Sequence, residues 1–167
     1  MTAIHETAYP RLRSSITEKE LVDIYTPEKY EIEFINKNAK KDSSKLGLLV
    51  LLKLFQRLGY FPNINDIPFQ IIEYIGLIGG FKNIKSNIKI YSKIKYRWLH
   101  MSVIRNYLNI NAFSNGGKEV MIEVMINASH FKDIIADIIN VAIEEMVKKR
   151  YELPSFSTFL RIALDSR

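Results

Sequence analysis

The segment from Asp133 to Arg150 constrains the fold of this chain more than any other stretch. Asp133 precedes the segment's apolar stripe and basic residues end it, as the helix dipole favours. The apolar side chains of the segment recur at the period of one helix face, and they are Ile134, Ile135, Ile138, Ile139, Ala142, Ile143, Met146 and Val147. No stretch of the chain alternates apolar and polar residues as a β-strand does, so the sequence predicts an all-α protein.

Further helices are predicted where a start signal precedes a helical repeat. Residues 17–20 have the spacing of a capping box, and Thr26-Pro27 repeats a start signal with proline at the first helical position. Ser43 or Ser44 is expected to cap a third helix that ends at Gly59. This third helix is apolar nearly all round, so we expect it to be central and buried.

The rest of the chain continues the helical pattern. Helices are expected from Pro68 to Gly79-Gly80, over 82–108 with a break near 92–95, over 118–128, and from Phe156 to Arg167. In total we expect an all-α fold of about seven or eight helices with helix-turn-helix-like elements. Residues 1–15 are expected to form a flexible arm, and 16–167 a domain that divides into two subdomains, about 16–80 and 81–167. The loop 109–117 is the alternative place for the boundary.

Composition excludes several classes of protein. With 47% apolar and 25% charged residues among 167, the chain is expected to be globular. It has no cysteine, which excludes disulfides and thiolate metal sites and suits a reducing cytoplasm. Its apolar run over 46–52 is far shorter than the roughly 20 residues that a bilayer requires, so no membrane association is expected.

The positive charge is concentrated in one part of the sequence. Positions 75 to 118 contain eight lysine or arginine residues and no aspartate or glutamate. Since the formal net charge of the whole chain is +6, this stretch supplies all of the excess. A cationic surface of this kind favours an anionic partner such as nucleic acid.

The sequence shows no catalytic or metal-binding constellation. The histidines His5, His100 and His130 lie in three separate segments, and none has a second histidine nearby. The pairs Gly79-Gly80 and Gly116-Gly117 match neither a phosphate-binding loop nor a dinucleotide fingerprint. We therefore expect no enzyme activity, no metal and no cofactor within this chain.

The lysine-rich segment 82–93 is the strongest functional signal in the residues themselves. Its lysines are spaced to stack along one face of a helix, while Ile84, Ile88 and Tyr91 occupy another face that can dock to the core. Beyond this segment the apolar side is expected to continue through Trp98, Met101, Ile104 and Leu108. With the preceding helix and the Gly79-Gly80 turn, it suggests a helix-turn-helix in which this helix reads the DNA groove. The candidate DNA-binding residues are Lys82, Lys85, Lys89, Lys93, Lys95, Arg97, His100 and Arg105.

Within this set the lysines and Arg105 are expected to contact phosphates, and Arg97 is a candidate base reader. His100 is open to a second interpretation, a histidine packed between helices. The cationic face is open to others, a merely solvated surface or an anionic membrane surface. A separate alternative is a protein-interaction module, in which the stripe from Ile134 to Val147 forms a dimer seam and no specific DNA binding exists.

Several sequence motifs, in order, resemble the N-terminal domain of the Tn-three family of replicative bacterial transposases. The motifs that carry the resemblance are Ile16 to Leu21 with Tyr25 to Glu28, Arg57 to Pro62, Ile67-Pro68 with Ile72 to Ile75, Tyr91 to Arg97 with His100, Ile104, Arg105, Leu108 and Phe113, and Leu153 to Leu160. Together they extend over about residues 16–167. An asparagine, Asn109, stands where the family pattern has glycine shortly after Leu108.

The resemblance implies a function that the residues alone do not. It implies a DNA-binding region that recognises the terminal inverted repeats of a transposon. The catalytic DDE domain, with its Mg²⁺, would then lie outside this chain, in a longer parent protein that can form a homodimer. The expected location is the bacterial cytoplasm, at the nucleoid when DNA is bound.

Overall fold

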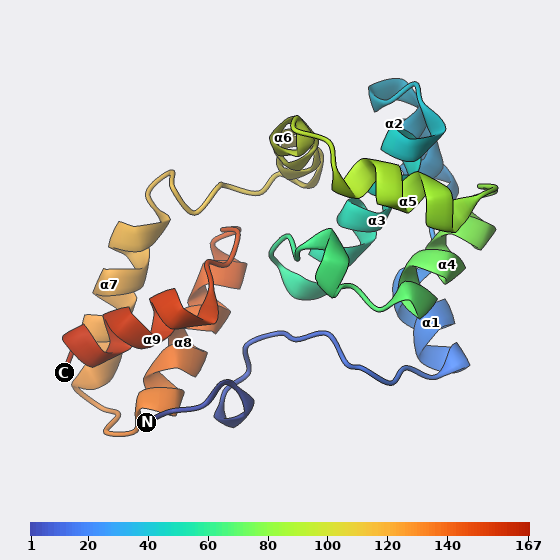
Figure 1. Cartoon of the computed structure of the whole chain (residues 1–167). Coiled ribbons are helices and arrows are strands. Elements are labelled where there is room, and N and C mark those ends of the chain that lie inside the picture. The colour runs from blue at the N-terminus through green and yellow to red at the C-terminus, as the bar shows by residue number, and fades with distance from the viewer. The chain divides into compact units, whose positions relative to one another are not determined.

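The computed structural model describes all residues, 1–167, and it confirms the all-α prediction with nine α-helices rather than seven or eight. Two 3-10 turns, η1 (Ile4–Glu6) and η2 (Ile64–Asp66), accompany them, and an isolated bridge joins Asn111 to Tyr151. The helices are α1 (Glu18–Tyr25), α2 (Lys29–Asn38), α3 (Asp42–Leu58), α4 (Phe69–Ile78), α5 (Ile84–Ser92), α6 (Arg97–Leu108), α7 (Gly117–Ser129), α8 (Ile135–Lys148) and α9 (Phe156–Asp165) (Figure 1).

The chain forms two compact units. The central unit is Arg11–Ile104, and the terminal unit combines Met1–Pro10 with Arg105–Arg167. The division falls inside α6, whereas the sequence suggested a subdomain boundary near residue 80 or in the loop 109–117. None of the nine helices has both the length and the apolar content needed to cross a membrane.

Helix α3 is the core of the central unit, as its apolar sequence predicted. Its residues Leu46 and Leu48 to Leu52 are completely buried, and α2, α4 and α5 all pack against it. It ends at Leu58, and Gly59 follows in the left-handed conformation at φ 79°, as expected for a helix C-terminus. A helix buried on every side fixes the positions of the helices around it.

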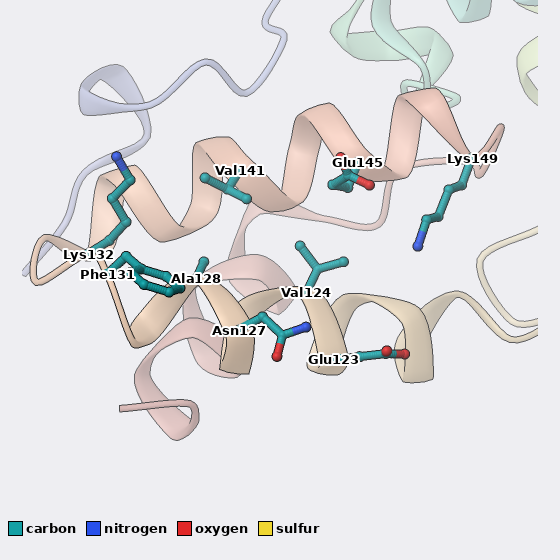
Figure 2. Close-up of a pocket in the computed structure, with 9 residues that line it drawn as sticks. All are labelled: Glu123, Val124, Asn127, Ala128, Phe131, Lys132, Val141, Glu145 and Lys149. Carbon is teal, nitrogen blue, oxygen red and sulfur yellow. The ribbon is translucent and has the colours of Figure 1, made fainter.

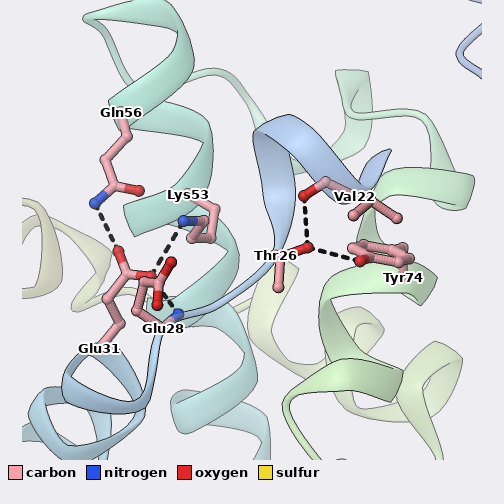
Figure 3. Close-up of polar contacts among 7 residues, drawn as sticks. All are labelled: Val22, Thr26, Glu28, Glu31, Lys53, Gln56 and Tyr74. Atoms are coloured by element: carbon pink, nitrogen blue, oxygen red, sulfur yellow. Dashed lines mark hydrogen bonds and ion pairs between the residues drawn. The ribbon is translucent and has the colours of Figure 1, made fainter. Parts of the chain in front are cut away.

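A buried carboxylate attaches α2 to α3 (Figure 3). Glu31 accepts hydrogen bonds from Lys53 Nζ at 3.1 Å and from Gln56 Nε2 at 2.7 Å. It also accepts one from the backbone N–H of Glu28 at 2.7 Å, at the start of α2. Because each Glu31 oxygen has a polar partner, the charge of Glu31 can remain in the core.

A second polar contact connects α1 to α4. The hydroxyl of Thr26 donates to the Val22 carbonyl at 2.6 Å and shares a hydrogen bond of 2.7 Å with the Tyr74 hydroxyl. The last turn of α1 is therefore held against α4, the helix that leads into the basic segment.

Helices α7, α8 and α9 build the core of the terminal unit. Met121, Met125, Ile139, Met146 and Phe159 are completely buried in it. Residues 1–10 belong to this core rather than to the flexible arm that the sequence suggested. Tyr9 is buried, donates its hydroxyl hydrogen to the Pro154 carbonyl at 2.7 Å, and places its ring edge-on to the rings of Phe156 and Phe159.

Some helix boundaries differ from those predicted. Helix α2 begins at Lys29 rather than at Pro27, because Glu28 and Glu31 form the first-turn hydrogen bond. Helix α3 begins at Asp42, so Ser43 and Ser44 lie inside it and are buried rather than capping it. Helix α8 is shorter at both ends than the predicted 133–150, and α9 ends at Asp165 rather than Arg167.

Candidate nucleic-acid interface

The lysine-rich segment forms α5 and the short turn that follows it. Asn83 precedes α5 in the left-handed conformation, at φ 52°, and the side chain of Asn87 donates to the Lys82 carbonyl at 3.0 Å. This arrangement turns the chain sharply after Gly79-Gly80, where α4 ends as predicted and Gly80 has φ 82°. The break that the sequence predicted near 92–95 is confirmed, since α5 ends at Ser92 and α6 begins at Arg97.

The lysines of this segment are exposed. The ion pairs of the structure use other cations, namely Arg13, Lys19, Lys53 and Arg105, so no carboxylate neutralises these lysines. Two of these lysines lie on α5 itself, one precedes it and two lie in the turn after it. Together the five unneutralised ammonium groups create a positive field that attracts a polyanion. The exposed residues are Lys82, Lys85, Lys89, Lys93 and Lys95.

The opposite face of α5 is anchored in the core of the central unit. Ile84, Ile88 and Tyr91 are buried, as their spacing predicted, and α5 packs against α3 (Figure 1). The Tyr91 ring occupies the space left by Gly47 of α3, where an added Cβ would lie only 2.2 Å from the ring carbons. The lysines are therefore carried on a helix whose position is closely fixed.

Tyr91 and His100 form a buried polar pair between α5 and α6. The Tyr91 hydroxyl lies 2.8 Å from His100 Nδ1, and the two rings stack with their centroids 5.5 Å apart. Burial raises the pKa of the Tyr91 hydroxyl above its usual range, an effect that the nearby Arg97 charge opposes, and burial lowers the pKa of His100. Near neutral pH both groups are therefore uncharged, and they share this hydrogen bond.

The turn between α5 and α6 is held by Tyr96. Its hydroxyl shares a hydrogen bond of 3.1 Å with Ser44 Oγ of α3, and its ring packs edge-on against His100 at 5.7 Å between centroids. Both contacts lie immediately before Arg97, the first residue of α6. Arg97, the candidate base reader, is partly exposed and forms no ion pair with a carboxylate.

Two candidates from the sequence occupy other surroundings than the lysines. His100 is buried, so its place between α5 and α6 matches the packed histidine that was the second interpretation. Arg105 belongs to the terminal unit and donates through Nε to Glu152 Oε1 at 2.6 Å. The structure thus places five lysines and Arg97 on the surface of the central unit. His100 lies in the core below α5 and contacts Tyr91.

The sequence placed Trp98 on the buried face of α6, and the structure corrects this. Trp98 is 64% exposed, whereas His100 and Ile104 are the buried residues of that helix. His100 and Ile104 are four residues apart and share a face, and a residue two positions before His100 points away from it. The histidine could have indicated this face, but histidine is not read as a core residue.

The terminal unit has a groove of its own. A groove of about 450 Å³ lies between α7 and α8 of the terminal unit, with Phe131 at one end and the acidic pair Glu123 and Glu145 farther along it (Figure 2). Lys132 and Lys149 complete its charged rim. No group of three or more histidine, aspartate or glutamate side chains in the chain is arranged to hold a metal ion.

The comparison with protein families identifies the chain over nearly its full length. A family model described as a domain of unknown function, DUF4158, matches residues 1–165. The chain belongs to the DUF4158 family. The DUF4158 match includes both compact units and all nine helices, so the central and terminal units are parts of one family domain. Among curated proteins there is no match to this DUF4158 chain.

Proposed function

We propose that this chain binds duplex DNA and recognises the terminal inverted repeats of a transposon. The observation that carries the proposal is the exposed, unneutralised row of lysines on α5 and the turn after it. Each phosphate that a lysine neutralises releases condensed counterions, so affinity grows with every contact of this kind. The anchoring of α5 through Tyr91 supports the proposal, because it holds the row in one geometry.

The proposed contacts divide by chemistry. The five lysines Lys82, Lys85, Lys89, Lys93 and Lys95 bind phosphates, since an ammonium group acts as a compact point charge. Arg97 reads a base, because its guanidinium can donate two parallel hydrogen bonds to a guanine edge. His100 positions Tyr91 and the start of α6, and Arg105 contacts DNA only if it exchanges its bond with Glu152.

The identity of the DNA target rests on the resemblance to the Tn-three family. In that reading the chain is the recognition part of a transposase that acts in the bacterial cytoplasm and nucleoid. It has no catalytic role, and the Mg²⁺-dependent DDE chemistry belongs to another part of the parent protein.

The proposal is tested by fluorescence anisotropy of labelled DNA. The full chain is titrated against the terminal repeat that flanks its gene and against a scrambled duplex, each at two salt concentrations. We expect tighter binding to the repeat and a steep salt dependence with both duplexes. Equal affinities would contradict end recognition, and the absence of binding would contradict DNA binding altogether.

A pair of double variants assigns the salt dependence to α5. Lys89→Ala/Lys93→Ala removes two proposed phosphate contacts and should flatten the slope of log affinity against log salt by roughly one to two units. Lys37→Ala/Lys40→Ala makes the same change of charge at the end of α2, where both lysines are exposed, and should leave the slope unchanged. A slope unaffected by the first variant would remove α5 from the interface.

The alternative function, a protein-interaction module, can no longer rest on the isoleucine stripe of α8 as a dimer seam. Most of the isoleucine stripe of α8, including Ile138, Ile139 and Ala142, is buried in the terminal unit and is not available as a dimer seam. Only its end residues Ile134 and Val147 are exposed. Under this alternative a protein contact uses another apolar surface, such as the groove beside Phe131. Concentration-dependent association without DNA affinity would favour the alternative.

A further inference from the structure

The first turn of α6 and the residue before it present large apolar side chains to solvent, next in sequence to the lysines. Trp98 is 64% exposed, Leu99 is 45% exposed and Tyr96 is 40% exposed. They lie within four positions of Lys95, and the sequence around them contains no acidic residue. Exposed aromatic and cationic side chains in one place are uncommon on a surface that only has to be solvated.

The backbone beneath Trp98 is firmly held. His100 and Ile104 bury the inner face of α6, and Tyr96 bonds to Ser44 of α3 immediately before the helix begins. The Trp98 side chain, in contrast, has no hydrogen bond and no ring contact. The indole of Trp98 is therefore an exposed apolar ring on a well-anchored helix, and it is accessible to a partner.

The chemistry next to the indole selects the partner. Lys93, Lys95 and Arg97 precede Trp98 in the sequence, and none of them is neutralised by a carboxylate. A polyanion with apolar, planar groups between its charges satisfies both features, and nucleic acid is such a polymer. In the major groove of a duplex an apolar side chain contacts base edges such as the thymine methyl group, and this contribution does not depend on releasing counterions.

We infer that α6, rather than α5, is the base-reading helix and that Trp98 makes a direct non-ionic contact with the bases; this rests on the proposed function. The residues 93–96 join α5 to α6 by a four-residue turn, which is the length typical of a helix-turn-helix. In such a pair the first helix crosses the phosphate backbone and the N-terminal residues of the second enter the major groove. The lysines of α5 then hold phosphates while Arg97 and Trp98 reach the base edges.

Trp98 is the only tryptophan in the chain, so its fluorescence reports this contact directly. The full chain is titrated with the terminal-repeat duplex, while anisotropy of a label on the DNA follows binding independently. We expect the indole emission to change and its access to a soluble quencher to fall in step with DNA binding. Unchanged emission and unchanged quencher access at DNA saturation would overturn the inference, while leaving DNA binding itself established.

Substitutions separate the indole contact from the ionic contacts. Trp98→Ala should weaken binding to the repeat by roughly tenfold, because one apolar contact with the base edges is lost, while the salt slope stays unchanged. Trp98→Phe should retain most of the affinity. Tyr30→Ala removes another exposed aromatic of the central unit, 59% exposed on α2, and should have no effect.

The outcomes are distinct from those of the proposed function. Loss of binding in the Lys89→Ala/Lys93→Ala variant with full affinity in Trp98→Ala would support phosphate contacts by α5 and overturn base contact by Trp98. Failure of the unsubstituted chain to bind DNA would overturn both proposals. Protection of Trp98 that depends on protein concentration and not on DNA would assign the patch to a protein partner and also overturn the inference.

Discussion

The contact between Tyr91 and Gly47 sets the position of α5. The ring of Tyr91 is completely buried, and it lies where any side chain at position 47 would have to begin. At this place the absence of a Cβ is required by the close approach of a ring rather than by the backbone angles. The position of the α5 lysines thus depends on Gly47 of α3, because only glycine leaves room for the Tyr91 ring.

Replacing Gly47 tests this dependence. Gly47→Ala places a Cβ 2.2 Å from the Tyr91 ring, so α5 has to move, and we expect a loss of about 1–3 kcal/mol or more in the free energy of unfolding. Gly76→Ala is the matched control, because its Cβ would meet an aliphatic side chain, Ile84, at 2.7 Å from Cδ1 and 2.8 Å from Cγ1, which is a less severe overlap than that with the Tyr91 ring. Urea denaturation should show the larger loss for Gly47→Ala, and equal losses would contradict the argument.

His100 predicts a dependence of stability on pH. Burial lowers its pKa below the ordinary value of 6.5, so at mildly acidic pH the unfolded chain binds a proton that the folded chain does not. The stability contribution is complete above the unfolded pKa, and it is lost as the pH falls below that value and through the folded pKa. The free energy of unfolding should therefore decrease between about pH 7 and about pH 5.

The variant His100→Asn isolates this effect. Asparagine can accept a hydrogen bond from the Tyr91 hydroxyl but does not titrate, so the fall in stability over the same pH range should become smaller. The measurement is urea denaturation of both proteins across the range. An identical pH dependence in the variant would show that other groups cause it.

Among the elements, α2 and α3 are joined by an ion pair that is almost fully shielded from water. Removing only Lys53, as in Lys53→Met, leaves the Glu31 charge buried with a single side-chain partner, and should cost about 3–5 kcal/mol. The double variant Glu31→Gln/Lys53→Met removes both charges and should recover part of this loss. Chemical denaturation of the unsubstituted chain, the two single variants Lys53→Met and Glu31→Gln, and the double variant forms a double-mutant cycle. This cycle measures the coupling between Glu31 and Lys53.

An exposed pair provides the comparison for that cycle. Lys19 and Asp23 lie 3.5 Å apart on α1, with both side chains largely in solvent. Lys19→Met should cost less than about 1 kcal/mol, because water screens the charge that remains. A similar cost for Lys19→Met and Lys53→Met would contradict the role given to burial.

Helix ends could be predicted where the signal is local. Thr17 accepts a hydrogen bond from the Glu20 N–H at 3.1 Å, and Gly59 adopts the left-handed conformation, both as the sequence indicated. The start of α2 was misplaced because a proline signal and a carboxylate pair compete within a few residues, and the pair at Glu28 prevails. Local patterns of this kind do not reveal which of two signals the tertiary structure uses.

The candidate site was only partly predictable for a related reason. The spacing of Ile84, Ile88 and Tyr91 was enough to place the lysines on the outer face of α5. The orientation of α6 could not be obtained in the same way, because its buried face is chosen by the Tyr91 hydroxyl, which requires a polar partner in the core. Periodicity favours an apolar residue there, and so it placed Trp98 inside.

For the whole molecule, the association of the first residues with the last helices is the feature without a sequence signal. Tyr9 reaches Pro154, Phe156 and Phe159 across most of the chain, and nothing in the pattern around Tyr9 indicates such distant partners. The same long-range pairing explains why the sequence suggested a free arm and a boundary near residue 80. Contacts between segments far apart in the sequence therefore determine which residues belong to each compact unit.

Tyr9 gives a prediction at this scale. Tyr9→Ala removes a buried ring from the terminal unit and should lower the free energy of unfolding of that unit by about 3 kcal/mol. Circular dichroism follows helices of both units, whereas the fluorescence of Trp98 follows the central unit alone. Helix loss should begin at lower denaturant concentration than the fluorescence change, and coincident transitions would contradict separate cores.

The division of the chain also sets an order of events during synthesis. Residues 11–104 leave the ribosome with all the segments of their unit present, so this unit can fold while translation continues. Residues 1–10 emerge before this unit, yet their partners in α9 are translated after it. Residues 1–10 therefore wait for their partners while the whole central unit is made, and their apolar side chains stay exposed throughout that interval.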